Sequence, residues 1–564
     1  MIVAGAFAGG AHGAKPSHAV TLSPAPGTPD ASPTTQISVL GARPTGVVAA
    51  GSRSGGHPGA LRAYAAAPGA SFVPSRAFAP GERVRVRVAF GSRHISYAFQ
   101  VGRPVPVAAA AAAQPPGGGA ESFVSEPGLH PPRIAVRTFS GAPSGGDFFV
   151  TPATQRSGKM VGQFGPLIAD ARGEPVWVQP LPAGVVAANL RPQTLAGEPV
   201  LTWWQGQIAA PAGDLSGEDV IADRSYRTVA TVRAGNGYVA DLHEFVVSGQ
   251  TALITVYSRV RMDLSALGGS RHGTAFDAIV QRNDLKTGLV MFEWHALGHV
   301  PMRDCYFRPQ RSGAVYDPYH VNSIQPLAGG DLLVSMRNTW TAYDLTPSGG
   351  IRWQLGGRRS SFRLGRGVRF AWQHDVQLHP GGLVSVFDNE GHVQRAQSRG
   401  LLIRLDRRRR TATLAHSYAH RPHLFARYEG NVQLLPGGDT LVGWGGESYF
   451  SEFSRAGRLL LDARFPGFDD SYRVFRYPWS ATPAQPPAAA VRAGSVYASW
   501  NGATGVSQWR LLAGSAPATL APVATVARAG FETAIPAGGS GPYFEVQALG
   551  AAGQVLGSSA VVHS

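Results

Sequence analysis

Cysteine and lysine are almost missing from this sequence. Cys305 is the only cysteine, so no disulfide can form within the chain, and the cysteine count does not indicate a redox compartment. The only lysines are Lys15, Lys159 and Lys286, so the net charge of +16 comes almost wholly from arginine. The arginines are scattered rather than gathered with aromatic residues on one element, which argues against nucleic-acid binding. Two readings of the charge stay open, a base-composition bias of the source genome and a field that attracts small anions.

Long apolar runs are also absent. No run approaches the roughly twenty apolar residues that a membrane-spanning helix needs, so we expect no membrane span. The opening MIVAGAFAGGAHGAKPSHA has a short run of small apolar residues with an Ala-x-Ala-like end but lacks a basic start, and we interpret it as the remnant of a signal peptide. We expect residues 1–35 to be without regular structure.

Two end modules with strand patterns flank the centre of the chain. Residues 36–106 alternate apolar and polar residues, most plainly in RVRVRVAF from Arg83, and predict an N-terminal β-sandwich. The Ala/Pro/Gly-rich residues 107–122 predict a linker. Residues 486–564 resemble a fibronectin type III-like β-sandwich, with three aromatic residues on alternating strands, Trp500, Trp509 and Tyr543.

A repeated hairpin organises the region between these modules, residues 123–480. In Asp317–Asn338, two apolar runs meet at Gly329-Gly330, which predicts a β-hairpin. Similar hairpins recur at spacings of 54, 77, 54 and 57 residues, anchored at Asn189, His243, His320, His374 and Asn431. Such a period indicates a repeat architecture.

Each hairpin is followed by a second pair of strand-like runs, and six such outer pairs imply six four-stranded sheets. Radial closure lets such sheets bury both faces and hide their edges. We therefore predict an all-β fold with a six-bladed β-propeller. A solenoid is the competing repeat fold, but these repeats carry insertions of very unequal length, the two longest at residues 262–276 and 296–316.

Three histidines take corresponding positions at the starts of three consecutive hairpins, His243, His320 and His374. A hairpin that starts at His320 ends at Arg337, so it returns a guanidinium to the same rim as the imidazole. In a propeller the loops around the innermost hairpins converge on the central axis. We expect these four side chains to share one pocket.

The elements HEF at His243, HVNSI at His320 followed by SMRN, and WQHDV at His374 resemble the bacterial arylsulfotransferase family of the six-bladed propeller type. The resemblance covers roughly residues 120–480 and implies an exported enzyme with an N-terminal β-sandwich. It implies that His374 is transiently sulfated and that His243, His320 and Arg337 hold the sulfuryl group. Asn322 would match the asparagine beside the second histidine, and we expect both Asn322 and Asn338 to contact substrate.

The chemistry suits these residue types. A neutral imidazole can attack sulfur and later leave, a guanidinium can meet the negative charge of the transition state, and a second histidine can carry the proton of the phenol. We expect nucleotide-independent transfer of a sulfuryl group between phenols by a ping-pong mechanism, without metal or other cofactor. Small aryl sulfates and phenols would be the partners, and the protein would be secreted or associated with the cell envelope.

Three alternatives stay open. The histidines could bind zinc or copper, although the sequence shows no carboxylate paired with them. The protein could hydrolyse aryl sulfates, or it could be a non-catalytic binding propeller between two adhesive sandwiches. Aromatic residues that could bound a substrate are Trp203, Trp204, Trp340, Trp372 and Tyr449.

Overall fold

The structure is a computed structural model, and it describes residues 20–105, 120–139, 141–154, 160–209, 214–310, 314–390 and 396–564. Regular structure in these residues is almost entirely antiparallel β-sheet, with four short 3₁₀ turns at η1 (Ser265–Leu267), η2 (Met302–Asp304), η3 (Ala328–Gly330) and η4 (Pro380–Gly382). The predicted all-β class is confirmed. No helix in these segments is long and apolar enough to cross a bilayer.

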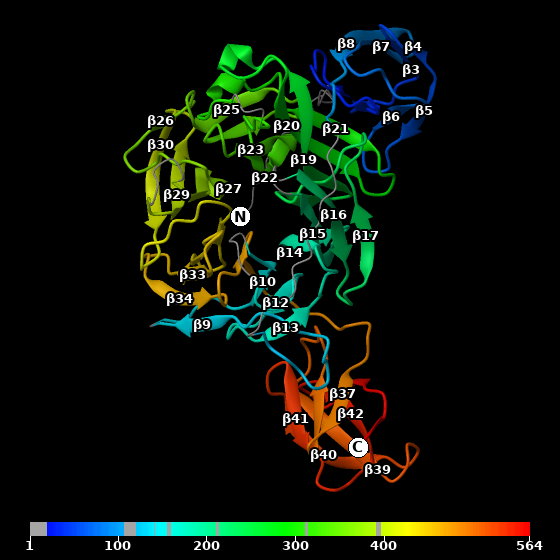
Figure 1. Cartoon of the computed structure of the whole chain (residues 1–564), viewed down its shortest axis with the longest axis vertical. Coiled ribbons are helices and arrows are strands. Elements are labelled where there is room, and N and C mark those ends of the chain that lie inside the picture. Colours follow the sequence, from blue (N-terminus) through cyan, green and yellow to red (C-terminus); the bar gives the residue numbers. More distant parts are fainter. Residues whose placement is uncertain are drawn as a thin grey trace, which may run out of the picture.

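Two four-stranded sheets form the N-terminal module, drawn in blue in Figure 1. In order across each sheet, the strands are β1 (Thr21–Ser23), β2 (Ile37–Leu40), β6 (Gly69–Pro74) and β5 (Gly59–Ala63), and β4 (Gly55–His57), β3 (Gly46–Gly51), β7 (Arg83–Phe90) and β8 (Arg93–Gln100). In β7 the valines are buried and the arginines exposed, so the alternating pattern sets which face packs. Val84 and Val86 meet Ile37 and Phe72 of the other sheet in one core.

The sandwich begins earlier than expected. Thr21–Ser23 pairs with β2, so the absence of regular structure that we expected up to residue 35 is wrong for the residues from 20 onward. Residues 1–19, which include the signal-like run, and most of the predicted linker lie outside the described residues.

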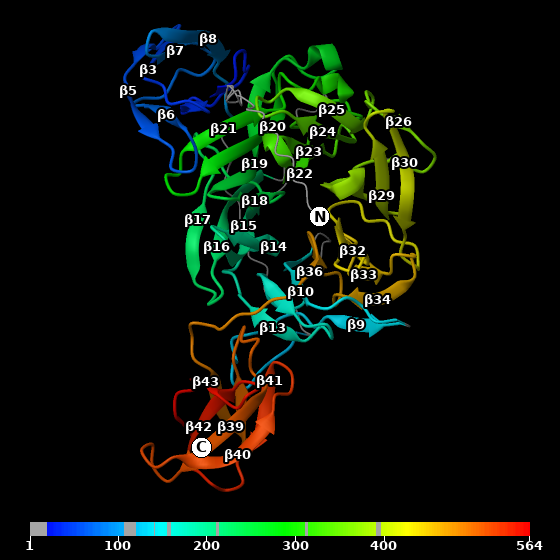
Figure 2. The ribbon, with the colours of Figure 1, turned by 180° about the vertical axis from the view of Figure 1, so that it is seen from behind.

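Six sheets then follow in a ring (Figures 1 and 2). Listed across each sheet, the first three are β13 (Pro175–Val178), β12 (Leu167–Ala169), β10 (Asp147–Val150) and β36 (Phe475–Tyr477); β14 (Val186–Leu195), β15 (Glu198–Ala209), β16 (Asp214–Ala222) and β17 (Thr228–Val232); and β18 (Phe245–Ser248), β19 (Thr251–Met262), β20 (Gly273–Asp284) and β21 (Val290–His295).

The other three sheets are β22 (Val321–Pro326), β23 (Leu332–Met336), β24 (Thr341–Leu345) and β25 (Ile351–Gly356); β27 (His374–His379), β28 (Leu383–Asp388), β29 (Arg399–Asp406), β30 (Thr411–Tyr418) and β26 (Arg363–Leu364); and β31 (Asn431–Leu434), β32 (Thr440–Gly443), β33 (Tyr449–Phe453), β34 (Leu459–Arg464) and β9 (Ala135–Thr138). A short pair, β11 (Pro152–Ala153) and β35 (Asp470–Ser471), lies apart from them.

Strands from both ends of the region close the ring. β36, which follows the last sheet in sequence, pairs with β10 of the first sheet, and β9, which precedes the first sheet, pairs with β34 of the last. This exchange covers sheet edges that would otherwise be open. The arrangement is that of a β-propeller.

The hydrophobic core lies between neighbouring sheets rather than at the centre of the ring. Leu253 and Val280 of the third sheet pack against Val334 of the fourth, for example, and Leu333 of the fourth packs against Val384 of the fifth. Apolar side chains therefore face the neighbouring sheets, which leaves the axis to the loops at the strand ends.

The predicted hairpin turns are present. β22 and β23 pair antiparallel around η3, where Gly329 and Gly330 have φ of 82° and 87°. Glycine reaches this left-handed region without strain, whereas a side chain would clash with its own backbone. The Gly-Gly pair therefore fixes the turn that returns Arg337 toward His320.

The C-terminal module has two sheets. Across each sheet, the strands are β37 (Ala488–Arg492), β38 (Ser495–Ser499) and β41 (Glu532–Pro536), and β40 (Ala521–Ala527), β39 (Gln508–Gly514), β42 (Tyr543–Leu549) and β43 (Val555–Ser558), with β44 (Val562–His563) also on β42. Trp500 and Trp509 are buried in its core. The likeness to fibronectin type III stays a prediction. Asn501 fixes the module to the first sheet through hydrogen bonds to both backbone groups of Val178, at 2.8 and 2.9 Å.

Candidate active site

The three histidines lie where inner strands begin. His374 is the first residue of β27, His320 immediately precedes β22, and His243 lies two residues before β18. Arg337 immediately follows β23, and its backbone N–H donates to the carbonyl of His320 at 2.9 Å. The hairpin therefore places the guanidinium and the imidazole at the same end of the sheet, as its sequence predicts.

Their positions in the repeat are not all equivalent. One residue at the start of each of these inner strands forms a hydrogen bond to the next sheet, and we call it the linking residue; the three are Glu244, Asn322 and Asp375. Asn322 donates to the carbonyl of Gln373 at 2.7 Å, and Asp375 accepts from the N–H of Val432 at 3.3 Å. His243 and His374 directly precede their linking residue, whereas His320 stands two residues before its own. The corresponding position that we predicted for all three is therefore wrong by one residue for His320.

The three imidazoles converge around two tyrosines. The ring centres of His243 and His320 are 4.9 Å apart, and both rings contact Tyr257, at 5.3 and 5.7 Å. Tyr472 contacts His243 at 5.7 Å and His374 at 6.3 Å. Residues separated by more than 200 positions thus share one cluster, which lies at the start of the inner strands.

Two of the histidines have carboxylate partners. Nδ1 of His243 lies 2.5 Å from Oδ1 of Asp241, and Nδ1 of His320 lies 2.5 Å from Oδ2 of Asp317. The expectation that no carboxylate pairs with these histidines is therefore wrong. Both pairs are local in sequence, in the segments DLH and DPYH, so this spacing is the signal that could have predicted them.

Asp317 is held in its ionised form. Burial alone would raise the pKa of its carboxyl group, but the nearby His320 and Arg337 bring that pKa below its ordinary value. Burial lowers the pKa of His320, against the opposing effect of Asp317. His320 is thus an imidazole whose Nδ1–H is donated to a carboxylate, which leaves Nε2 for proton exchange.

The hydrogen bonds of His374 determine its tautomer. The amide nitrogen of Asn389 donates to the carbonyls of Ala426 and Glu429, at 2.8 and 2.9 Å, so Oδ1 of Asn389 faces Nδ1 of His374 at 2.8 Å. Nδ1 must then carry the proton, and Nε2 presents its lone pair. The backbone N–H of Glu429 donates a long hydrogen bond to this lone pair, at 3.3 Å, and that bond must open when Nε2 attacks.

Burial, and after it the positive charge of Arg337, lowers the pKa of His374 well below its usual value. The side chain is only 2% exposed. His374 is therefore neutral at neutral pH, which is the form in which an imidazole is a nucleophile.

The guanidinium of Arg337 has an N–H donor that no described residue accepts. Its guanidinium lies over the Trp372 ring at 4.3 Å and near the Tyr428 ring at 5.7 Å, and Nη1 donates to Oδ1 of Asn338 at 3.1 Å. Its Nε is buried and has no hydrogen-bond partner in the described part of the chain. A buried N–H without an acceptor is costly, so this geometry is suited to binding an anion.

The two predicted substrate-binding asparagines are buried and hold backbone. Asn322 is inaccessible, and its amide group holds Gln373, the residue before His374. Asn338 donates to the carbonyl of Asp317 at 2.7 Å and accepts from Arg337. Both side chains thus position neighbouring site residues in this structure.

One arginine ties the inner strands together beside the histidines. Arg473 is almost wholly buried; its Nη1 lies 3.0 Å from Oε2 of Glu244 and 3.9 Å from Oδ1 of Asp375, and its Nη2 donates to the carbonyl of Asn322 at 2.7 Å. These partners belong to three successive sheets. No repeat pattern in the sequence marks Arg473, because it occurs once on the axis.

Of the five aromatic candidates, Trp372 contacts Arg337. Trp340 stacks on Tyr306 with ring centres 3.4 Å apart, beside the site. The others lie elsewhere, Trp203 and Trp204 in cores between sheets and Tyr449 against His420.

Only one group of at least three His, Cys, Asp or Glu residues in the described segments brings ligand atoms close enough for a metal ion, and it consists of Asp30, Asp277 and His295. It includes none of the three site histidines.

Comparisons with known proteins bear on this site. Residues 191–466 match the family model described as Arylsulfotransferase (ASST), a span that contains the three histidines and Arg337. No curated protein matches. Among solved structures, a protein of unknown function from Bacteroides caccae matches at 13% identity over 58% of this chain and 98% of its own, with a TM-score of 0.34. Virginiamycin B lyase from Staphylococcus aureus matches at 10% identity over 65% and 94%, with a TM-score of 0.29.

The two structural likenesses are too weak to support a functional argument, whereas the family match covers the whole cluster. It supports aryl sulfotransferase activity in general terms. Through residues 191–466, the chain belongs to the arylsulfotransferase family.

Proposed function

We propose that this protein transfers a sulfuryl group from an aryl sulfate to a phenol through a covalent intermediate on His374. The observation that carries the proposal is the fixed tautomer of His374, which presents a neutral Nε2 lone pair in the cluster that Arg337 faces with an unpaired donor. A nucleophile and an anion-binding group in one cluster are what sulfuryl transfer requires.

In the first half-reaction, Nε2 of His374 attacks the sulfur of the donor. The N–S bond forms and the S–O bond to the aryl group breaks. The departing phenolate takes the Nε2 proton of His320 or His243, which must have taken up this second proton beforehand and is left as the neutral, Nδ1-protonated imidazole. The proton on Nδ1 of His374 stays hydrogen-bonded to Asn389, which keeps the sulfated ring cationic and therefore a good leaving group.

In the second half-reaction, an acceptor phenol gives its proton back to the same histidine and its oxygen attacks sulfur. The N–S bond breaks and neutral His374 is restored. Arg337 and the backbone N–H of Glu429 are the donors placed to meet the sulfuryl oxygens in both halves. Two half-reactions that share one covalent form give ping-pong kinetics.

Aromatic side chains beside the cluster suit aryl substrates. Phe307 and Tyr428 are 39% and 41% exposed. Tyr428 and Trp372 contact Arg337, Phe307 packs against Trp372, and Tyr306, next to Phe307 in sequence, stacks on Trp340. Large exposed aromatic residues around a pocket commonly bind planar ligands. The loop that carries Tyr306 and Phe307 belongs to the long insertion at 296–316.

Transfer and hydrolysis are distinguished by the product. We expect 4-nitrophenyl sulfate to release nitrophenol at a rate that rises with added phenol, and phenyl sulfate to form in equal amount. Free sulfate that appears independently of phenol would indicate a hydrolase. No nitrophenol release with any phenol would favour the binding-protein alternative. We further propose export to the cell surface or beyond, which fractionation of the producing cells would test.

A further inference from the structure

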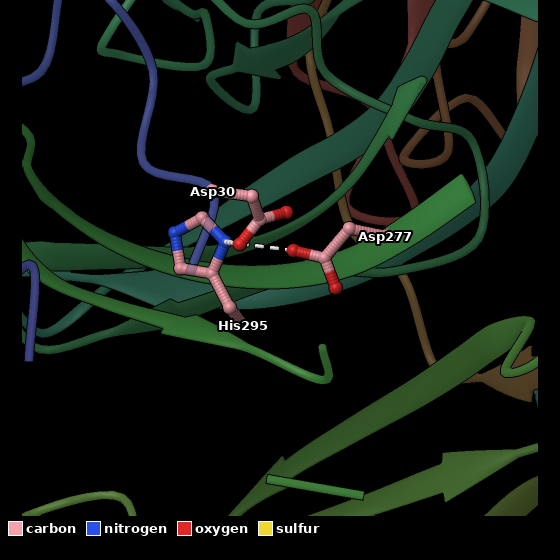
Figure 3. Close-up of side chains that lie close together, drawn as sticks. All are labelled: Asp30, Asp277 and His295. Carbon is pink, nitrogen blue, oxygen red and sulfur yellow. Dashed lines mark hydrogen bonds and ion pairs between the residues drawn. The ribbon is translucent and has the colours of Figure 1, made fainter. Parts of the chain in front are cut away.

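A second cluster of ionisable side chains, with one histidine and its carboxylate neighbours, lies where the N-terminal sandwich meets the propeller, outside the site described above. It joins Asp30, in the loop between β1 and β2, to Asp277 of β20 and His295 at the end of β21. In Figure 3 both carboxylate groups point to the same edge of the imidazole ring, and they come from segments far apart in sequence. The three side chains are at most 2% exposed.

Three carboxylates surround this one imidazole. Nδ1 of His295 lies 2.7 Å from Oδ2 of Asp277 and 3.2 Å from Oδ1 of Asp30, and Nε2 lies 3.0 Å from Oε1 of Glu293. No arginine or lysine in the described segments forms an ion pair with any of the three carboxylates. With all three carboxylates ionised, even a protonated His295 would leave an excess of negative charge in a buried place, which a further cation would offset.

The three carboxylates differ in the hydrogen bonds that they accept. Asp277 accepts a backbone N–H, and Glu293 accepts the amide groups of Asn236 and Gln281 at 2.7 and 2.6 Å. Neither oxygen of Asp30 accepts a conventional hydrogen bond from any described residue, although its side chain is buried and directed at the cluster. A buried carboxylate that lacks donors and faces an imidazole indicates a missing cationic partner.

We propose that Asp30, Asp277 and His295 bind one divalent metal ion of the Zn²⁺ or Mn²⁺ type. Imidazole nitrogen with carboxylate oxygen is a donor set that these ions accept, whereas Ca²⁺ and Mg²⁺ prefer oxygen alone. The donor atoms already lie within 4.8 Å of one another. Around a tetrahedral Zn²⁺ they would stand about 3.4 Å apart, so the 2.7 Å between Asp277 and the imidazole would widen by about 0.7 Å.

Glu293 completes the arrangement. With the metal on Nδ1, the other ring nitrogen of His295 keeps its proton and donates it to Glu293, at the 3.0 Å already present. A carboxylate that orients a metal-bound histidine in this way is the usual outer partner of such sites. The amides of Asn236 and Gln281 in turn fix Glu293, so the outer partner is itself held.

The bound ion would join the two modules. Asp30 belongs to the sandwich and both other ligands to the third sheet, and the same interface contains the hydrogen bond from the N–H of Glu293 to Ser23 at 3.0 Å. Because the chain has one cysteine, no disulfide can fasten these modules together. A metal ligated from both sides would provide a comparable cross-link.

The full-length protein, stripped with a chelator and dialysed, tests the site directly. We expect titration calorimetry with ZnCl₂ or MnCl₂, together with elemental analysis, to give one tightly bound ion per chain. The melting temperature should rise with the metal and fall when chelator is added. Asp30→Asn, which keeps the shape but removes the charge, should weaken binding at least tenfold.

His420→Gln is the matched control, because His420 is buried like His295 but faces only one carboxylate, Asp462, at 3.2 Å. It should bind the metal as the wild type does. The proposal is overturned if the wild type takes up neither metal, or if Asp30→Asn binds as tightly as the wild type. The metal stoichiometry is measured on the wild type, so this test does not depend on whether a variant folds. None of these measurements uses sulfotransferase activity, so they do not depend on the proposed function.

Discussion

The fork of donors on Arg337 is the feature whose loss we can predict most closely. Nη1 already donates to Asn338 and Nε has no partner, so at least one charged N–H is held ready for a sulfuryl oxygen. In Arg337→Lys the single ammonium group must serve both Asn338 and the substrate. The loss of one preorganised donor to a developing negative charge slows reactions by about 100-fold to 1000-fold, or about 2.7–4 kcal/mol of transition-state stabilisation.

We therefore expect Arg337→Lys to reduce kcat/KM for 4-nitrophenyl sulfate by roughly 100-fold, with most of the change in kcat. Arg337→Met should lose more, because it removes the charge as well. Arg337→Met should also raise the pKa of His374, since the positive charge of Arg337 helps to lower that pKa.

Arg427→Lys is the control for packing. Arg427 lies over the same two rings as Arg337, at 5.7 Å from Trp372 and 5.3 Å from Tyr428. A much smaller effect is expected there, because the proposed role of Arg337 depends on its fork rather than on ring contact. If Arg337→Lys retains wild-type turnover, or if both variants lose the same amount, Arg337 does not hold the sulfuryl group.

Three further predictions concern proton transfer, pH and stability. Asp317→Asn should slow transfer by at least about 100-fold from aryl sulfates whose phenol has a high pKa, and much less from 4-nitrophenyl sulfate, because His320 loses the carboxylate that supports its basicity. An equal loss of rate for all donors would contradict this role of Asp317. Because the pKa of His374 is depressed and its neutral form reacts, kcat/KM should persist as pH falls through 6.5 and decline only below it; a midpoint at or above 6.5 would be incompatible with that nucleophile. Arg473→Met should reduce the free energy of unfolding by about 3–5 kcal/mol in urea titrations, since it removes the cation beside buried Asp375 and one of the two cations that pair with buried Glu244. Arg172→Met, whose ion pair is exposed, should cost at most about 1 kcal/mol, and equal effects would remove Arg473 from its central role.

Much of the architecture could be predicted from the sequence because it repeats. The Gly-Gly turns, the alternating strands and the spacing of 54–57 residues at three of the four steps each reflect a local geometry, and local geometry fixes where Arg337 stands relative to His320. The exact repeat position of His320 could not be predicted, because the hydrophobic pattern does not show that His320 stands two residues before Asn322 whereas His374 stands one residue before Asp375.

The remaining site residues come from contacts that no local pattern carries. Asn389 follows β28, and Tyr257 lies in the middle of β19, so their meeting with His374 and His320 depends on how the sheets surround the axis. The contact between Asp30 and the propeller spans more than 240 residues. Such pairs become visible only when the sheets are assembled.

Mass spectrometry of the protein after brief exposure to an aryl sulfate, without acceptor, is the most direct test of the central claim. We expect one sulfuryl group on the peptide that contains His374, lost when phenol is added and absent from His374→Ala. Because that side chain contributes little to the cores between sheets, the variant should still fold. A sulfuryl group on another residue, or none while the wild type releases nitrophenol in a burst, would contradict a covalent intermediate on His374.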